Sequence, residues 1–235
     1  MCKNKSTFVI FLFIVSFSFS NENKTKEFRG FFDFSYDESK DKIFLQVDKL
    51  DHEFLYVGSL ASGVGSNDIG LDRGQLGSER LVKFIKKGNK LLLVEPNLYY
   101  RAETKNISEK KSVEQAFAKS VIFGFEIMET NDNHYLIDFT PFLMFDRHGV
   151  AKTLRDSKQG SYKVDKTKSA IEINNTKAFP NNVEFEALLT FSGEAKGSLI
   201  RSVTPDPDNV TVFQHHSFIK LPDNNYTPRK FDTRS

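Results

Sequence analysis

The chain has 235 residues, 33 Lys and Arg against 31 Asp and Glu, and a formal net charge of +2, with 39% hydrophobic and 27% charged residues. At this length about 70% of the unfolded surface can be buried, so the composition excludes a disordered chain and a polytopic membrane protein. The nearly neutral charge argues against a nucleic-acid partner, and a single Cys excludes an internal disulfide and a cysteine-based zinc site.

The first twenty residues predict a secretory signal peptide. Two lysines precede the apolar run 7–15, and Ser18 and Ser20 place small residues three and one positions before the expected cut. The run is shorter than the ~20 residues that a membrane-spanning helix needs, which disfavours the alternative of a membrane anchor. We therefore expect residues 1–20 to be removed on export to the periplasm or the extracellular space, leaving a mature chain without membrane attachment.

The next segment, residues 21–27, is polar and predicts a disordered leader. Apolar stretches with the pattern of β-strands then follow one another, and we expect about ten strands. The stretches are 28–36, 43–47, 54–60, 81–85, 91–94, 121–127, 135–139, 170–173, 183–191, 198–203 and 210–220.

Three features inside these stretches carry specific expectations. Gly88–Asn89 between two apolar runs predicts a tight hairpin, because Gly supplies the positive φ of the first turn position. The strand 91–94 is apolar on both faces, which predicts a central place in the sheet. The strand 183–191 alternates, so we expect Glu184 and Glu186 to lie on an exposed face, although paired carboxylates can also act as acid and base.

Two short helical inserts are predicted. Ser112 with a glutamine three residues later matches a capping box, so we expect a helix to begin there after a solvated loop over residues 103–111. Thr140–Pro141 matches a second helix start, with a hydroxyl cap and proline at the first helical position. We expect this helix to run to about Leu154 with a break near Gly149.

Strands follow strands through short turns, without the regularly alternating helices of a parallel sheet. The expected fold is therefore mainly β (α+β), an antiparallel β-sandwich or curved sheet of about ten strands with two short helical inserts. We expect one β-rich domain over residues 28–220 and a polar tail over residues 221–235.

A glycine-punctuated loop at residues 61–79 contains the pair Asp72 and Arg73. Long loops of this kind are uncommon in compact domains and are often functional. Arg73 can clamp a carboxylate with two parallel hydrogen bonds, or it can tie the loop to the domain with Asp72 as its local partner. We favour the loop tie and keep the carboxylate clamp as the alternative.

The histidines do not suggest a metal site. The pattern that begins at His52 resembles the start of a zinc-protease motif, but its fifth residue is Tyr56 instead of a second histidine. His215 and His216 are adjacent on an expected strand, so their rings point to opposite faces and do not easily share one metal; we expect packed, hydrogen-bonded rings there. Solvated rings are expected at His134 and His148.

Other catalytic signatures are missing from the sequence as well. There is no Gly-x-Ser-x-Gly nucleophile motif, no phosphate-binding loop and no dinucleotide-binding motif. We therefore predict no catalytic residue, no metal ligand and no cofactor in this chain. An enzyme with an unrecognised site stays open as an alternative.

Several strings, in order along the chain, resemble the N-terminal domain of a family of exported bacterial zinc-dependent metalloproteases. The resemblance covers about residues 28–235, and the strings after residue 213 are the most specific. The strings are Ser59-Leu60-Ala61-Ser62-Gly63, Gly70-Leu71-Asp72-Arg73-Gly74-Gln75, Lys177-Ala178-Phe179-Pro180-Asn181, Leu188-Leu189-Thr190-Phe191, Gln214-His215-His216-Ser217-Phe218, Leu221-Pro222-Asp223, Tyr226-x-Pro228-Arg229 and Phe231-Asp232-x-Arg234-Ser235.

In that family this domain has no known function and precedes a separate peptidase domain. The peptidase domain holds zinc through a His-Glu-x-x-His motif, and zinc polarises the peptide carbonyl and activates water. None of those residues is present here, so the resemblance implies kinship with a protease but not proteolysis by this chain. It also implies that the chain is an N-terminal fragment, with the peptidase domain beyond Ser235 and zinc only in the full-length protein.

The resemblance thus implies a non-catalytic accessory domain that packs on or regulates the peptidase domain, shapes its cleft or binds its peptide substrate. Several matching strings lie in loops and in the tail, where core packing does not demand them. A stand-alone exported module that binds peptide or glycan is the alternative. The expected contact residues are Asp72, Arg73, His215, His216, Arg229, Asp232 and Arg234.

Overall fold

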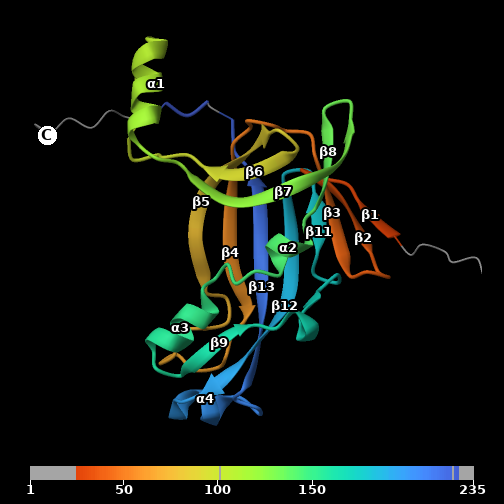
Figure 1. Cartoon of the computed structure of the whole chain (residues 1–235), viewed down its shortest axis with the longest axis vertical. Coiled ribbons are helices and arrows are strands. Elements are labelled where there is room, and N and C mark those ends of the chain that lie inside the picture. The colour runs from red at the N-terminus through yellow and green to blue at the C-terminus, as the bar shows by residue number, and fades with distance from the viewer. Residues whose placement is uncertain (1–24, 101, 224, 228–235) are drawn as a thin grey trace, which may run out of the picture.

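The computed structural model describes residues 25–100, 102–223 and 225–227, and within these ranges a 13-stranded antiparallel sheet forms the fold (Figure 1). The expectation of a mainly β fold with a curved sheet is confirmed. The strand order is β1-β2-β3-β8-β7-β6-β5-β4-β13-β12-β10, and β9 and β11 also pair with β12.

The strands and helices have the following bounds. The strands are β1 (Thr25–Phe28), β2 (Asp33–Asp37), β3 (Lys42–Val47), β4 (Phe54–Ser62), β5 (Leu76–Lys87), β6 (Lys90–Glu95), β7 (Ser120–Asn131), β8 (His134–Asp138), β9 (Gly160–Val164), β10 (Ala170–Ile171), β11 (Lys177–Phe179), β12 (Asn182–Ala195) and β13 (Asn209–Lys220). The helices are α1 (Ile107–Ala116), α2 (Thr140–Leu143), α3 (Val150–Asp156), α4 (Ser198–Val203) and the 3-10 turn η1 (Lys166–Lys168).

The sheet is curved so strongly that its first strands approach its last. The backbone N–H of Phe31, between β1 and β2, donates to the carbonyl of Phe179 at the end of β11, at 2.8 Å. The rings of Phe34 on β2 and Phe185 on β12 lie 5.0 Å apart. The concave face therefore encloses a core from both ends of the strand order.

The core is built mainly from phenylalanine. Alternate residues of β12 and β13 point inward. Figure 1 shows α2 against the sheet, and this helix adds the fully buried Phe142 to the core. Phe142 contacts the rings of Phe139 at 5.0 Å and Tyr56 at 5.6 Å. Each fully buried ring contributes roughly 1.5–3 kcal/mol by leaving water. The buried phenylalanines with the largest volumes are Phe32, Phe54, Phe84, Phe139, Phe142, Phe185, Phe191 and Phe218.

Several local predictions are confirmed. The hairpin between β5 and β6 turns at Gly88, whose φ of 57° is the left-handed conformation that glycine adopts readily. The strand β6 lies between β5 and β7 as a central strand. The helical segment after Thr140 divides into α2 and α3, and Gly149, with φ of 82°, stands at the break. The predicted hydroxyl cap is wrong, because Phe139 is the N-cap of α2 and the hydroxyl of Thr140 accepts from the N–H of Ile43 at 3.0 Å.

Other local predictions are wrong. Residues 25–27 are not a leader, because β1 pairs with β2 from Thr25 onward. The first helix begins inside the expected loop 103–111, where Asn106 caps it by accepting from the N–H of Ser108 at 2.9 Å. Ser112, the expected start, lies inside α1.

Residues 198–203 form the helix α4 instead of a strand. The side chain of Ile200 in α4 is buried, and the backbone N–H of Ile200 donates to the side-chain oxygen of Gln159 at 3.1 Å. The predicted signal peptide lies outside the described residues. Within the part of the chain that is described, no helix has the length and apolar character needed to cross a bilayer.

Candidate functional site

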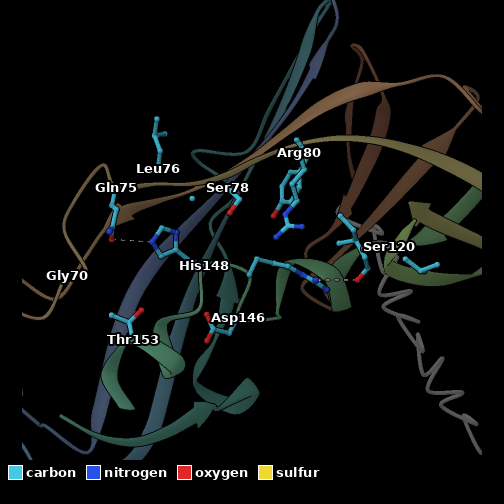
Figure 2. A pocket seen from close by; sticks show the side chains of 15 residues that line it. Gly70, Gln75, Leu76, Ser78, Arg80, Ser120, Asp146, His148 and Thr153 are labelled. Carbon is cyan, nitrogen blue, oxygen red and sulfur yellow. Dashed lines mark hydrogen bonds between the residues drawn. The ribbon is translucent and has the colours of Figure 1, made fainter. Parts of the chain in front are cut away.

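A pocket of about 590 Å³ opens between the first half of β5 and the first residues of β7. Its third wall is the loop between α2 and α3. Figure 2 shows Ser78 and Arg80 from β5 together with Asp146 and His148 from this loop. None of these residues was predicted as a site residue, because three segments far apart in the sequence meet here.

Gln214 on β13 fixes the position of the pocket loop. Its side-chain oxygen accepts from the backbone N–H groups of Arg147 and His148, at 2.8 and 2.9 Å. Its side-chain nitrogen donates to the carbonyl of Phe145 at 2.9 Å. Only 1% of Gln214 is exposed, so these buried bonds determine how the loop presents its side chains to the pocket.

Asp146, the acidic residue of the pocket lining, is occupied by the backbone of α3. Its carboxylate accepts from the N–H groups of Gly149, Val150 and Ala151 at 2.8, 2.8 and 2.9 Å. These are donors that a helix start leaves without intrahelical partners. Asp146 therefore stabilises the first turn of α3, and its carboxylate is already engaged by those three backbone donors.

We expect Asp146→Ala to lower the free energy of unfolding by about 2 kcal/mol, at the upper end for the loss of a helix cap, because three backbone donors lose their acceptor. Urea unfolding followed by circular dichroism measures this change, since the chain has no Trp for fluorescence. Asp156→Ala, at the exposed far end of the same helix, is the control and should have little effect. Equal effects of the two variants would contradict the capping role.

Arg147 brings a positive charge to the pocket. Its guanidinium lies against the rings of Phe142 and Phe145, with 4.7 and 4.4 Å to the ring centroids. Its Nη1 donates to the carbonyl of Ile122 at 3.4 Å, while its Nε is buried without a hydrogen-bond partner. Burial lowers the pKa of Arg147, and no ion pair joins it to an acid among the described residues. The guanidinium thus keeps unused donors beside the pocket.

His148 is half-buried, contrary to the expectation of a solvated ring. Its Nε2 lies 3.3 Å from the side-chain oxygen of Gln75, and its Nδ1 is buried without a hydrogen-bond partner. Burial lowers the pKa of His148, so the ring is neutral at pH 7. His134 is exposed, as expected.

The strand β5 has a free edge at the pocket. Leu76 and residues 79–82 pair with β4, with a shift of register between them, whereas pairing with β6 begins only at Lys83. The strand β6 ends at Glu95 and is followed by Pro96, which has no N–H to continue a ladder. Because an antiparallel strand directs its backbone groups alternately to its two sides, residues 76–82 keep unpaired donors and acceptors on the side away from β4.

A second surface feature is the segment between β6 and β7, residues 96–100 and 102–119, here called the arm. It contains α1, which buries none of its side chains. Figure 1 shows α1 standing away from the sheet. Tyr99 is 94% and Ile107 81% exposed, and the rings of Tyr100 and Phe117 stack at 3.8 Å. The arm therefore presents apolar side chains that the described chain leaves uncovered.

Residues 74–235 match a protein family described as a domain of unknown function (DUF5117). The chain belongs to this family. No curated protein and no solved structure matches it. The DUF5117 match begins at Gly74, just before β5, yet β4 lies between β5 and β13 in the same sheet. The folded unit therefore includes strands that precede the matched residues.

The expected contact residues of the DUF5117 domain do not form one surface among the described residues. Asp72 and Arg73 lie in the loop between β4 and β5, and neither side chain has a described hydrogen bond or ion pair. The expected tie between them is thus not seen, and the loop is held by backbone bonds such as Val64 N–H to Leu71 O at 3.0 Å. Arg229, Asp232 and Arg234 lie outside the described residues.

The two adjacent histidines of the DUF5117 domain point to opposite faces of β13, as predicted. His216 is fully buried, so it acts by packing inside the domain and is not available as a contact residue. Its Nδ1 lies 3.0 Å from the hydroxyl of Tyr56, and its Nε2 lies 3.1 Å from the side-chain nitrogen of Gln214. That nitrogen only donates, so Nε2 must accept and the ring is neutral with its proton on Nδ1.

Burial lowers the pKa of His216 to about 3, against about 6.5 in the unfolded chain. Its contribution to stability is complete above pH 6.5 and is lost as the pH falls toward the folded value, because only the unfolded chain binds the proton. We expect about 2 kcal/mol to be lost between pH 7 and pH 5 from this group. Urea titrations at both pH values, with His216→Gln as the non-titrating control, measure it. The same pH dependence in both proteins would refute this assignment.

His215, on the outer face, joins two carboxylates. Its Nε2 lies 2.9 Å from Glu184 and its Nδ1 3.1 Å from Glu186. The hydrogen bond to Glu184 is the main cause that raises the pKa of His215, and the ring is therefore held as a cation between the two acids. The prediction that both glutamates are exposed is wrong, since Glu186 is only 5% exposed.

This cluster is closed to a metal ion. Ser217 donates to Glu184 and Asn175 donates to Glu186, at 2.5 and 2.6 Å. Both ring nitrogens of His215 face carboxylates, which leaves no lone pair free for a cation. Across the described residues, no group of three His, Cys, Asp or Glu side chains is arranged to hold a metal ion.

Proposed function

We propose that this chain is a non-catalytic N-terminal accessory domain of an exported zinc-dependent metalloprotease, packing on or regulating the peptidase domain. Two things support the proposal. The ordered strings from Ser59 to Ser235 resemble that family. The candidate site also has the character of a binding site, since none of the hydrogen bonds described for His148 reaches a hydroxyl that could act as a nucleophile.

The observation that carries the docking role is the arm. A helix without buried side chains gains little stability from its own domain. Exposed apolar residues gathered on one segment are typical of a surface that a partner covers. Leu98, Tyr99 and Ile107 are exposed and all lie in the arm, which also contains the stacked rings of Tyr100 and Phe117. The partner that the resemblance supplies is the peptidase domain.

Zinc in this account belongs to the peptidase domain. The described side chains do not fit a zinc ion. The cluster around His215 comes nearest to a ligand set, but both ring nitrogens of His215 are already hydrogen-bonded to carboxylates. No step of proteolysis is therefore assigned to this chain.

The experiment mixes the purified chain with a zinc-dependent peptidase domain of the resembling family and follows co-elution in size-exclusion chromatography. We expect a one-to-one complex that is weakened at least about tenfold by the double variant Tyr99→Ser, Ile107→Ser, because large apolar anchors dominate interfaces. Met128→Ser, an exposed apolar residue on β7 outside the arm, is the matched control and should bind as the unaltered chain does. Co-elution that is indifferent to the arm variant would reject the docking role.

A stand-alone exported module that binds peptide or glycan is the second candidate. The observation that favours it is the pocket beside β5, whose polar groups do not depend on the arm. Binding of the chain alone to an immobilised peptide or glycan, with no association to the peptidase domain, would support this second candidate over the first.

A further inference from the structure

We propose that the pocket between β5 and β7 binds an extended polypeptide segment that carries a carboxylate. The segment adds as a strand to the free edge of β5, and its carboxylate is bound by Arg147. This site is separate from the arm, so the inference does not depend on the docking role; it rests on the second candidate function and specifies the peptide that the pocket would bind.

The backbone of β5 supplies the first part of the recognition. Residues 76–82 have a partner strand on one side only, and a break in register between Leu76 and Glu79 interrupts their pairing with β4. Such an edge is a template for another chain, and proteins commonly protect it by shortening, charge or cover. Here the regularly paired part of the edge, residues 79–82, borders a pocket of about 590 Å³, large enough to take several residues of a ligand. Strand addition at an edge is a recurring way of binding peptides.

Arg147 supplies the charge selectivity. Arg80, the other arginine of the pocket, is paired with Glu95 at 2.7 Å, and Asp146 is occupied by the start of α3. The guanidinium of Arg147 is thus the cation that the lining leaves without an acid among the described residues. A guanidinium with several unused N–H donors fits a carboxylate, which accepts two parallel hydrogen bonds.

The surroundings of Arg147 strengthen such a contact. The rings of Phe142 and Phe145 shield one side of the guanidinium, and its Nε is already out of water and unpartnered. A partly dehydrated cation gains more from an incoming anion than one in bulk water does. Leu76, 66% exposed, and Val121 lie at the same pocket and offer apolar contacts to a strand whose side chains alternate.

The test uses fluorescence anisotropy of the full chain with the labelled hexapeptide Val-Thr-Val-Asp-Val-Thr, amidated at its C-terminus. The Asp→Asn peptide removes the side-chain carboxylate, and the Asn peptide with a free C-terminus separates a side-chain from a terminal carboxylate. A fourth peptide carries N-methyl groups on alternate residues, which removes strand hydrogen bonds. We expect the Asp peptide to bind at least about tenfold more tightly than the amidated Asn peptide and the N-methylated peptide.

The variant Arg147→Met keeps the apolar packing and removes the charge, so it should abolish the preference for the Asp peptide. Arg155→Met, an exposed arginine on α3, is the matched control and should change affinity less than twofold, roughly the scatter of such measurements. If Arg147→Met fails to fold, the comparison of the Asp, Asn and N-methylated peptides on the unaltered chain still tests whether the pocket binds a strand that carries a carboxylate. Equal binding of the Asp and both Asn peptides, undiminished binding of the N-methylated peptide, or no binding up to about 1 mM would overturn the proposal.

Discussion

Replacing Gln214 with leucine is expected to lower the free energy of unfolding by about 4 kcal/mol, because several buried polar groups lose their partner at once. The backbone N–H groups of Arg147 and His148 lose their acceptor, and the carbonyl of Phe145 loses its donor. The Nε2 of His216 also loses the side-chain nitrogen that it faces. Leucine fills a similar volume, so the loss measures the hydrogen bonds and not a cavity. Urea unfolding followed by circular dichroism gives the value.

The same substitution should also loosen the pocket loop and remove the binding of the Asp-containing peptide. Gln75→Leu is the matched control, since Gln75 is only partly buried and has one described side-chain contact, to His148 at 3.3 Å. It should change stability by less than about 1 kcal/mol. Gln214→Glu keeps the acceptor for the two N–H groups and should restore part of the loss. A Gln214→Leu protein as stable as Gln75→Leu would show that the loop does not depend on Gln214.

Replacing His215 with leucine is expected to lower the free energy of unfolding by about 3 kcal/mol at pH 6, because two largely buried carboxylates then face each other without their cation. The pKa of His215 is raised, so its contribution is complete below about 6.5 and is lost as the pH rises through the folded value. Burial acts to raise the pKa of Glu184, but its hydrogen bonds, first among them that from His215, together outweigh burial and lower this pKa. The contribution of Glu184 to stability is therefore lost as the pH falls below about 4.5. The cluster is therefore most stabilising between these two limits.

Urea titrations of the unaltered chain and of His215→Leu between pH 4 and pH 9 measure this difference. The gap between the two proteins should be widest near pH 6 and should narrow toward both ends. Adding Glu184→Gln and Glu186→Gln to the His215→Leu protein should recover most of the stability, since the repulsion is removed. A constant gap at every pH would mean that His215 stabilises the sheet by packing alone.

The pattern of β12 shows where sequence reasoning succeeds and where it stops. Alternation correctly placed Phe185 toward the core, because the period of a strand is a local property. The same alternation could not show that Glu184 and Glu186 would be covered, since their partner His215 lies on the neighbouring strand, 31 and 29 residues away. An outward position on a strand is therefore not always an exposed one.

The pocket was not predicted for a similar reason. Gln214 lies 66 to 69 residues from the three backbone groups that it holds, and no spacing in the sequence marks that pairing. A local signal was also misjudged at the arm. Asn106 is as good a helix cap as Ser112 and stands just before α1, but the charged residues around it suggested a loop.

Docking of this domain on a peptidase domain through its arm is tested most directly by amide hydrogen exchange of the mixture. In the free chain, α1 should exchange rapidly, because it has no buried side chains to hold its turns. With a zinc-dependent peptidase domain of the resembling family present, the account predicts slowed exchange over residues 102–119 and little change in the strands of the core. A complex that leaves the arm as unprotected as in the free chain, or no complex at all, would contradict the account.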